Sequence, residues 1–222
     1  MKGLFVTATD TNVGKTWLGS RLITELKKLK MNVQARKPIE SGWPISADVS
    51  ETDAWKLASA MGQTDELDIV CPNRFSAALS PDRAAMLEGE IITLEQLYQD
   101  CLIGVDETDF LYVEGAGGFY SPICNDGLNA DLAVSLGLPI LLVVENRLGC
   151  INQALLNVEA IAKQGLNLSA IALNRPNVDQ TDKAMDNFSD IQKRVDCEVI
   201  RFDYNQEKSD SIAKLAQLIL AV

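Results

Sequence analysis

Three short segments of this chain carry residue types that bind or transfer phosphate groups. The first, residues 5–16, reads FVTATDTNVGKT and ends in Gly14, Lys15 and Thr16. A glycine lets the backbone approach a phosphate, a lysine reaches terminal phosphate oxygens, and a hydroxyl can bind Mg²⁺. The common pattern G-x-x-x-x-G-K-[ST] requires a glycine at position 9, which is Thr9 here. The segment is therefore either a phosphate loop of another form or the ordinary start of a helix.

The surroundings of this segment favour a phosphate loop. An apolar run at 4–6 precedes it, and leucines at 18, 22, 26 and 29 follow with helical spacing. A loop between a strand and a helix is the setting in which backbone N–H groups and a helix N-terminus hold phosphate. Ala8 lies one place before the expected glycine, and it fits at little cost if the backbone there is ordinary.

The other two segments place charged side chains after apolar runs. VEGAGG at 113–118 puts Glu114 at the end of one run, where a carboxylate can bind Mg²⁺, and RKPIESG at 36–42 puts Lys37 at the end of another. Each also has a plain structural interpretation, as a solvated residue at a tight turn or strand end. Asp53, in SETDAWKLA, is at this stage best explained as an N-cap or first-turn residue of a helix.

Apolar runs alternate with amphipathic segments along the whole chain. The runs at 4–6, 32–36, 110–113, 139–144, 168–173 and 198–202 predict strands buried on both faces. Helical stripes are formed by the leucines above, by Ile151, Leu155, Val158 and Ala162, and by Ile212, Leu215 and Ile219. We therefore expect one domain over residues 1–222, an α/β, three-layer P-loop NTPase-like fold with a mainly parallel central sheet flanked by helices.

Composition excludes several classes of function. The 222 residues include 20 basic and 31 acidic ones, for a net charge of −11, which argues against non-specific binding to nucleic acid or anionic membranes. Without a histidine the chain can form no Ser-His-Asp triad and no His-ligated zinc site. The five cysteines form no C-x-x-C pair, and the longest apolar run, at 138–144, is too short to span a bilayer. A cytoplasmic location is expected.

Taken together, the segments resemble the dethiobiotin synthetase family, the ATP-dependent enzymes of biotin synthesis. The matching stretches are TDTNVGKT at 9–16, KPIESG at 37–42, the Asp53 helix start, VEGAGG at 113–118, LGCIN at 148–152 and Asn174. They cover about four-fifths of the chain in order. The family has a longer phosphate loop, in which Ala8 takes the first glycine position.

The resemblance implies roles for individual residues. Lys15, Lys37 and Thr11 would be catalytic, with Lys37 stabilising the carbamate intermediate and the transferred phosphoryl group. Thr16, Asp53 and Glu114 would surround Mg²⁺, and Asn174 would read adenine. Ser41, with Gly149, Cys150, Ile151 and Asn152, would bind the diamine substrate. The ATP-binding set would be Asn12, Val13, Gly14, Lys15, Thr16, Trp17, Asp53, Glu114, Gly115, Ala116, Gly117, Asn174, Arg175, Arg201, Phe202 and Asp203.

The reaction implied by the resemblance joins 7,8-diaminopelargonate and CO₂ at the expense of ATP. It proceeds through a carbamate and a carbamic-phosphoric mixed anhydride to dethiobiotin, ADP and phosphate. The resemblance further implies a homodimer, with the LGCIN helix start meeting the substrate carboxylate across the interface. A helix N-terminus is a physically suitable anion site.

Two other functions remain open from the sequence. A partitioning-type regulatory ATPase would share the fold, but that group carries a second lysine near the start of its loop, and residues 8–13 contain none. A nucleotide-binding module without turnover is the other alternative. The chain departs from the family at Asn12, where glutamate is common, and at Arg201, where a proline is usual.

Overall fold

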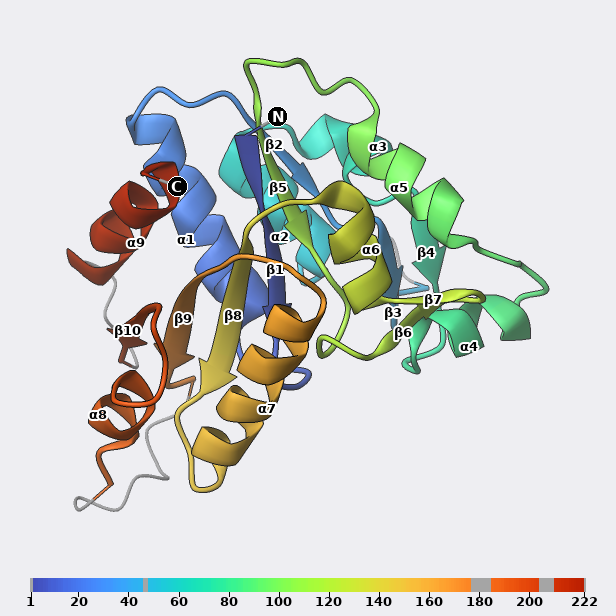
Figure 1. The fold of residues 1–222 in the computed structure, drawn as a ribbon. Helices are drawn as coiled ribbons and strands as arrows, with labels where there is room; N and C mark the ends of the chain where they lie inside the picture. The colour runs from blue at the N-terminus through green and yellow to red at the C-terminus, as the bar shows by residue number, and fades with distance from the viewer. Residues whose placement is uncertain (1, 46–47, 177–184, 204–209, 222) are drawn as a thin grey trace.

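Six parallel strands form the centre of the structure. The computed structural model describes residues 2–45, 48–176, 185–203 and 210–221. The central sheet has the order β10-β9-β8-β1-β5-β2 (Figure 1), and each neighbouring pair is parallel. Its strands are β1 Lys2–Ala8, β2 Val33–Arg36, β5 Phe110–Glu114, β8 Ile140–Glu145, β9 Leu168–Asn174 and β10 Glu198–Phe202. The six strands predicted from the apolar runs are confirmed.

Helices cover both faces of this sheet, as Figure 1 shows. They are α1 Lys15–Lys28, α2 Asp53–Met61, α3 Leu67–Val70, α4 Pro81–Leu87, α5 Leu94–Leu102, α6 Asn129–Leu136, α7 Cys150–Lys163, α8 Asn187–Gln192 and α9 Asp210–Leu220, with a 3₁₀ turn at Thr64–Glu66. Two small sheets add β3 Ile39–Ser41 with β4 Asn73–Phe75, and β6 Pro122–Cys124 with β7 Gly127–Leu128. Within the described residues, no helix is long and apolar enough to cross a membrane.

Alternation along the strands divides the core into two layers. In β1, Leu4 and Val6 pack into the cluster formed with α1, α2 and α9, whereas Phe5 packs into the cluster on the opposite face with α5, α6 and α7. Successive side chains of a strand point to opposite faces of a sheet. The strands are apolar throughout because both faces are covered, as expected for a parallel sheet. The predicted three-layer α/β architecture is thus confirmed.

One helical stripe is confirmed only in part, because Ile151 and Val158 of the predicted set pack against the core whereas Ala162 is exposed. The helix predicted around residues 151–162 exists as α7, but its buried residues include Cys150, Ala154 and Ile161. Leu155 is only half-buried, and Leu156 is 58% exposed. The two faces of α7 are both partly apolar, so helical spacing alone could not show which of them meets the sheet. Apolar side chains are consequently left at the surface of this helix.

The carboxyl ends of the six parallel strands lie at the same edge of the sheet. β1 is flanked by β5 on one side and β8 on the other, so the loop that follows β1 lies at the middle of this edge. Ligands of open α/β sheets bind at the carboxyl ends of the strands. The fold therefore brings the three chemistry-bearing segments of the sequence to one place.

Candidate functional site

The loop between β1 and α1 has the backbone of an anion-binding loop. Asn12 and Gly14 both have positive φ, 59° and 99°, and asparagine is among the few non-glycine residues that tolerate this conformation. Ala8 ends β1 in strand conformation, paired in register with Val143. Its backbone is the ordinary one that an alanine needs, so the missing glycine has no structural cost here.

The far end of β9 holds this loop in place. Asn174 is 3% exposed, and its side-chain Nδ2 donates to the carbonyl oxygen of Val13 at 2.8 Å. A Cβ atom at position 14 would overlap the same amide group, so Gly14 is required by space as well as by its φ. Asn174 therefore has a structural contact with the loop that the sequence did not reveal.

The N-terminus of α1 is suited to an anion. Of the described residues, none caps α1 with a side chain, and its first turn contains no acidic residue. The unpaired N–H groups and the helix dipole at such an end favour negative charge. The N-terminus of α2 differs, because Glu40 accepts hydrogen bonds from the backbone N–H groups of Asp53 and Ala54 at 2.8 and 2.9 Å. A carboxylate of the chain itself thus occupies the N-terminus of α2.

A buried charge network lies beneath the loop. Lys37 Nζ lies 2.9 Å from Glu114 Oε1 and 3.0 Å from Asp53 Oδ2, and it also donates to the carbonyl oxygen of Gly115 at 3.2 Å. Thr16 Oγ1 donates to Glu114 Oε1 at 2.7 Å. Lys37 and Glu114 are buried, whereas the Asp53 side chain is 40% exposed. The residues predicted to handle Mg²⁺ and the phosphoryl group are therefore in direct contact.

The charges in this network set one another's pKa values. Burial by itself would lower the pKa of Lys37, but the negative charges of Asp53, Glu114 and Glu40 outweigh it and raise that pKa above its ordinary value. Burial would likewise raise the pKa of Asp53, but the charge of Lys37 and the hydrogen bond from its ammonium group lower it to about 2. Lys37 is thus a cation and Asp53 an anion at neutral pH.

Lys15 has the opposite electrostatic environment. Burial, followed by repulsion from Lys37, lowers the pKa of Lys15 to about 8. Its Nζ donates to the carbonyl oxygens of Gly117 at 2.9 Å and Asp10 at 3.3 Å. Two lysines therefore lie in one cavity, and their mutual repulsion makes the site favourable for an additional negative charge.

Two supporting residues had no recognisable signal in the sequence. Asn129, buried at the start of α6, donates to the carbonyl oxygens of Ala116 and Gly118 at 2.6 and 2.9 Å and accepts from the N–H of Ala116 at 3.0 Å. It fixes the glycine-rich turn after β5. Glu40 orients the start of α2. Both act on backbone groups distant in sequence, which no local motif records.

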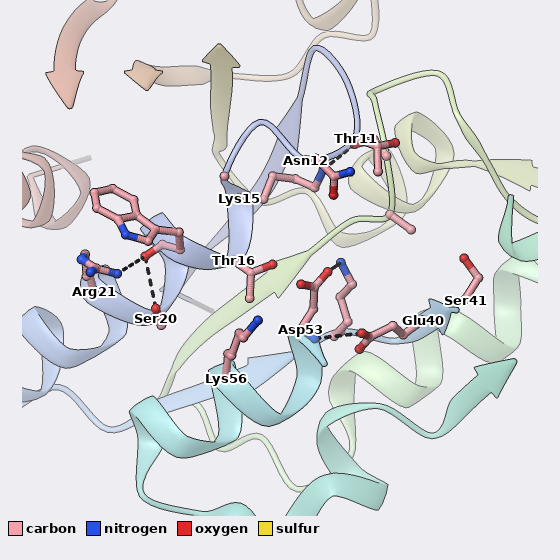
Figure 2. A pocket seen from close by; sticks show the side chains of 15 residues that line it. Thr11, Asn12, Lys15, Thr16, Ser20, Arg21, Glu40, Ser41, Asp53 and Lys56 are labelled. Atoms are coloured by element: carbon pink, nitrogen blue, oxygen red, sulfur yellow. Dashed lines mark hydrogen bonds and ion pairs between the residues drawn. The ribbon is translucent and has the colours of Figure 1, made fainter. Parts of the chain in front are cut away.

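The network and the loop surround one cavity of about 560 Å³, shown in Figure 2. Thr11, Asn12, Gly14, Lys15, Thr16, Trp17, Lys37, Ser41, Asp53, Ala116 and Gly117 line it, as do Ser20, Arg21, Glu40 and Lys56, which were not predicted. Ser41 donates its hydroxyl to the carbonyl oxygen of Leu79 at 2.6 Å. The loop, the metal-site candidates Thr16 and Asp53 and one substrate-site candidate thus share a single space, whereas the fully buried Glu114 does not line it and contacts the lining residues Thr16 and Lys37.

Residues predicted to contact the base lie to one side of that cavity. Arg175 donates its backbone N–H to the carbonyl oxygen of Phe202 at 2.9 Å, and the ring of Phe202 meets that of Trp17 edge-on with centroids 6.4 Å apart. Arg201 contacts the ring of Phe188 and lies 3.5 Å from Asp186. Asp203 follows the end of β10. Asn174 and these four residues do not line the cavity, and their nucleotide contacts stay a prediction.

The LGCIN segment forms the start of α7. Gly149 precedes the helix with φ 88°, Cys150 is buried and Asn152 is exposed. Leu148, next to them, is 85% exposed. Among the described residues, no side chain caps this helix and its first turn has no acidic residue. Like α1, α7 presents an N-terminus suited to an anion, but Gly149, Cys150, Ile151 and Asn152 do not line the cavity of this chain.

Comparison with known proteins identifies relatives over most of the chain. A family model described as an AAA domain matches residues 2–201. The ATP-dependent dethiobiotin synthetase of Caulobacter vibrioides (strain NA1000 / CB15N) is 38% identical over 188 residues, which are 82% of this chain and 85% of that protein. The enzyme of the same name from Ruthia magnifica is 34% identical over the whole length of both chains.

Solved structures show the same fold at much lower identity. The MinC:MinD cell division complex of Aquifex aeolicus matches with a TM-score of 0.59 and 16% identity, covering 100% of this chain and 88% of that one. A ParA family ATPase from Chlorobium tepidum matches with a TM-score of 0.56 and 14% identity, covering 99% and 91%. These likenesses confirm the P-loop NTPase-like fold.

Proposed function

Because this chain belongs to the family of ATP-dependent dethiobiotin synthetases and is therefore an ATP-dependent ligase, we propose that it converts 7,8-diaminopelargonate, CO₂ and ATP to dethiobiotin, ADP and phosphate. The observation that carries this proposal is the position of Lys37. Its buried ammonium lies at the base of the phosphate cavity, between two carboxylates, while a second lysine approaches from the loop. Chemistry that joins two anions requires cations at the reacting groups, and these two ammonium groups would supply them.

The reaction would proceed in three steps. One substrate amine attacks CO₂, and the resulting ammonium loses a proton to leave a carbamate. A carbamate oxygen then attacks the γ-phosphorus of ATP, and ADP leaves. Finally, the second amine attacks the carbamate carbon, expels phosphate and closes the cyclic urea after losing a proton. Both the carbamate and the triphosphate are anionic, so bringing them together is the main electrostatic difficulty.

The residues of the cavity have distinct roles in this scheme. Lys15 and the N-terminus of α1 would hold the triphosphate, as in other phosphate loops. Lys37 would donate hydrogen bonds to the carbamate and to the phosphoryl group as charge develops between them. Thr11 would take part in catalysis and Ser41 would hold the reacting diamine, and both residues line the cavity.

The donor set of the site fits magnesium. Thr16, Asp53 and Glu114 offer hydroxyl and carboxylate oxygens, the ligands that Mg²⁺ prefers, and their contacts through Lys37 and Thr16 bring these oxygens together. The described residues contain no group of three or more His, Cys, Asp or Glu side chains that could hold a metal ion by itself. Mg²⁺ is commonly bound by one or two carboxylates plus substrate phosphates, so this does not conflict with the proposal. When bound, the ion would neutralise charge on the triphosphate.

The protein is further proposed to act as a cytoplasmic homodimer. The N-terminus of α7 is suited to a carboxylate, yet its residues do not line the cavity of their own chain, and Leu148 and Leu156 leave apolar surface exposed beside them. A second copy that covers this surface would bring its α7 N-terminus to the substrate carboxylate. Asn174, Arg175 and Arg201–Asp203 would bind the base on the β9–β10 side.

Direct assay of the product tests the proposal. The protein is incubated with diaminopelargonate, bicarbonate, Mg²⁺ and ATP, and dethiobiotin and ADP are measured by mass spectrometry. We expect both products to appear together and to depend on the diamine. ATP hydrolysis that is indifferent to the diamine would contradict the proposal and favour a regulatory ATPase of the kind that shares this fold.

A further inference from the structure

A second hollow of about 380 Å³ opens between α1 and α2. It is lined by Ser20, Arg21, Thr24, Trp55, Lys56, Ser59 and Ala60. Ser20, Arg21 and Lys56 also line the main cavity, so the two spaces adjoin at these side chains. Figure 2, which draws the lining of the main cavity, shows Ser20 and Arg21 at the left and Lys56 to their right, below Thr16. We call this hollow the α1–α2 cleft.

The α1–α2 cleft is electropositive in an acidic protein. Its described lining contains two cations and three hydroxyl residues but no aspartate or glutamate, although the chain as a whole has a net charge of −11. Ser20 and Thr24 donate their hydroxyl protons to carbonyl oxygens of α1, so Arg21 and Lys56 are the charged groups of the described lining, and the partner of Lys56, Glu51, lies outside it. A concave surface lined by charge of one sign raises the local concentration of the opposite ion.

Arg21 is held in place at the junction of the two spaces. Its guanidinium lies 4.0 Å from the centroid of the Trp17 ring, and its Nη1 donates to the carbonyl oxygen of Trp17 at 3.2 Å. Stacking on an aromatic face fixes the plane of a guanidinium, and the planar fork of arginine matches phosphate geometry. This residue is therefore ordered before any anion arrives.

Lys56 faces the same space from α2 on a more adaptable side chain. It donates to the backbone oxygen of Glu51 at 2.8 Å and forms an ion pair with the Glu51 carboxylate at 3.0 Å. The Glu51 side chain is 91% exposed, and a pair of this kind is weak because water screens it. Lys56 can consequently exchange this partner for an anion in the cleft at little cost.

We propose that the α1–α2 cleft is a phosphate subsite adjoining the phosphate loop, in which Arg21 and Lys56 hold one phosphate group from opposite walls. The group has two possible sources, a phosphate of the bound nucleotide or the inorganic phosphate that the reaction releases. Arg21 and Lys56 line both the cleft and the cavity that contains Thr16 and Lys15, so either source would lie next to them. This inference rests on the proposed function, since it assumes that phosphate chemistry takes place in the main cavity.

Binding measurements on charge-removing variants test the subsite. Arg21→Ala, Lys56→Ala and the double variant are compared with the unmodified protein by calorimetry. ADP and ATP are titrated first, and inorganic phosphate is then titrated with and without saturating ADP. Lys28→Ala is the matched control, because it removes one positive charge from α1 at a side chain that is 67% exposed, paired with Glu25 and absent from both linings.

We expect the double variant to bind one of these ligands with an affinity lower by about tenfold or more, which is the effect of losing a charge-assisted hydrogen bond. Lys28→Ala should change the affinity for each ligand by less than about twofold. Loss of nucleotide affinity would identify the nucleotide's own phosphates as the source. Loss confined to inorganic phosphate would identify the released product. If the double variant matches Lys28→Ala for every ligand, the subsite does not exist.

Two further measures keep the outcome clear. Arg21→Gln and Lys56→Gln remove the charge but keep most of the side chain, so they replace the alanine variants if those unfold. All titrations are made without diamine and therefore without turnover. A protein that forms no dethiobiotin but loses phosphate affinity in the double variant would refute the proposed reaction and leave the subsite supported.

Discussion

The hydroxyl of Tyr112 occupies the space that a side chain at position 19 would fill. Gly19 lies in the second turn of α1, and a Cβ atom there would overlap the Tyr112 Oη and ring carbon. Tyr112 is fully buried on β5, and its hydroxyl donates to Glu114 Oε2 at 3.3 Å. The absence of a side chain on α1 thus makes room for a group that contacts the second oxygen of Glu114, a proposed metal ligand.

We predict strong coupling between these two positions. Gly19→Ala would ordinarily stabilise a helix by about 0.5–1 kcal/mol, but here it should destabilise the protein by about 1–3 kcal/mol because of overpacking. Tyr112→Leu should lower the free energy of unfolding by about 2 kcal/mol, because the smaller side chain leaves a cavity in the core. In the double variant the methyl group added at position 19 would occupy space that the Tyr112 hydroxyl has vacated, so the overlap and the cavity would both be reduced. Urea unfolding of all four proteins should therefore show a favourable coupling of at least about 1 kcal/mol, and strictly additive losses would contradict the overlap.

Replacing Lys37 should separate nucleotide binding from turnover. Lys37→Ala is expected to lower kcat by about 10²–10³-fold, as for loss of one group that stabilises transition-state charge, while ATP affinity by calorimetry stays within a few-fold. Because alanine leaves the buried Glu114 without its ammonium partner, Lys37→Arg, which keeps the charge but displaces it, is the matched control. An ATP affinity that falls as much as kcat would show that Lys37 binds nucleotide rather than the reacting groups.

Nucleotide affinity should depend on pH through Lys15. Its pKa is lowered to about 8 by burial and by Lys37, and bound phosphate would favour the protonated form. Below pH 8 Lys15 is already protonated, so affinity is at its maximum. Above pH 8 the free protein must take up a proton on binding, and affinity should fall by up to about tenfold per pH unit. Calorimetry in buffers of different ionisation enthalpy should detect this uptake, and it should vanish in Lys15→Met.

The proposed dimer makes a prediction for α7. Leu148→Asp places a charge beside the helix start at a residue that is 85% exposed, and it should shift the mass by light scattering from dimer toward monomer. Ile91→Asp is the control, because Ile91 is similarly exposed, at 72%, in the segment between α4 and α5. Dethiobiotin formation should fall with the dimer fraction. A protein that is monomeric without any substitution, under assay conditions, would refute this part of the proposal.

The sequence predicted the main sheet because its six strands are buried on both faces and therefore appear as continuous apolar runs. The strands β3, β4, β6 and β7 were missed, since segments of two or three residues are positioned by turns rather than by pattern. For α7 the helix was predicted correctly, and Ile151 and Val158 of the predicted stripe pack against the core, but its most buried residues, such as Ala154 and Ile161, were not predicted.

In the site, too, some residues could be predicted from the sequence and others could not. Lys37 and Glu114 could be placed because each ends a recognisable strand, and parallel strand ends meet at one edge. Asp53 required the family resemblance, since its position in the chain fits a helix start equally well. Glu40 and Asn129 escaped notice because they bind backbone groups brought near by tertiary folding. Arg21 and Lys56 escaped notice because they lie on two different helices, α1 and α2, which only the folded chain brings together.

The central place of β1 in the sheet has a consequence for how this enzyme can change. Lys37 and Glu114 follow β2 and β5 on one side of β1, whereas Asn174 and Phe202 end β9 and β10 on the other. The proposed transfer machinery and the proposed base-binding region therefore meet at the phosphate loop, through its Asn174 contact, and at the ring contact between Trp17 and Phe202. Arg201 on β10 is separated from Glu114 on β5 by β9, β8 and β1, so we expect substitutions on this flank to alter nucleotide choice more than bond-forming chemistry.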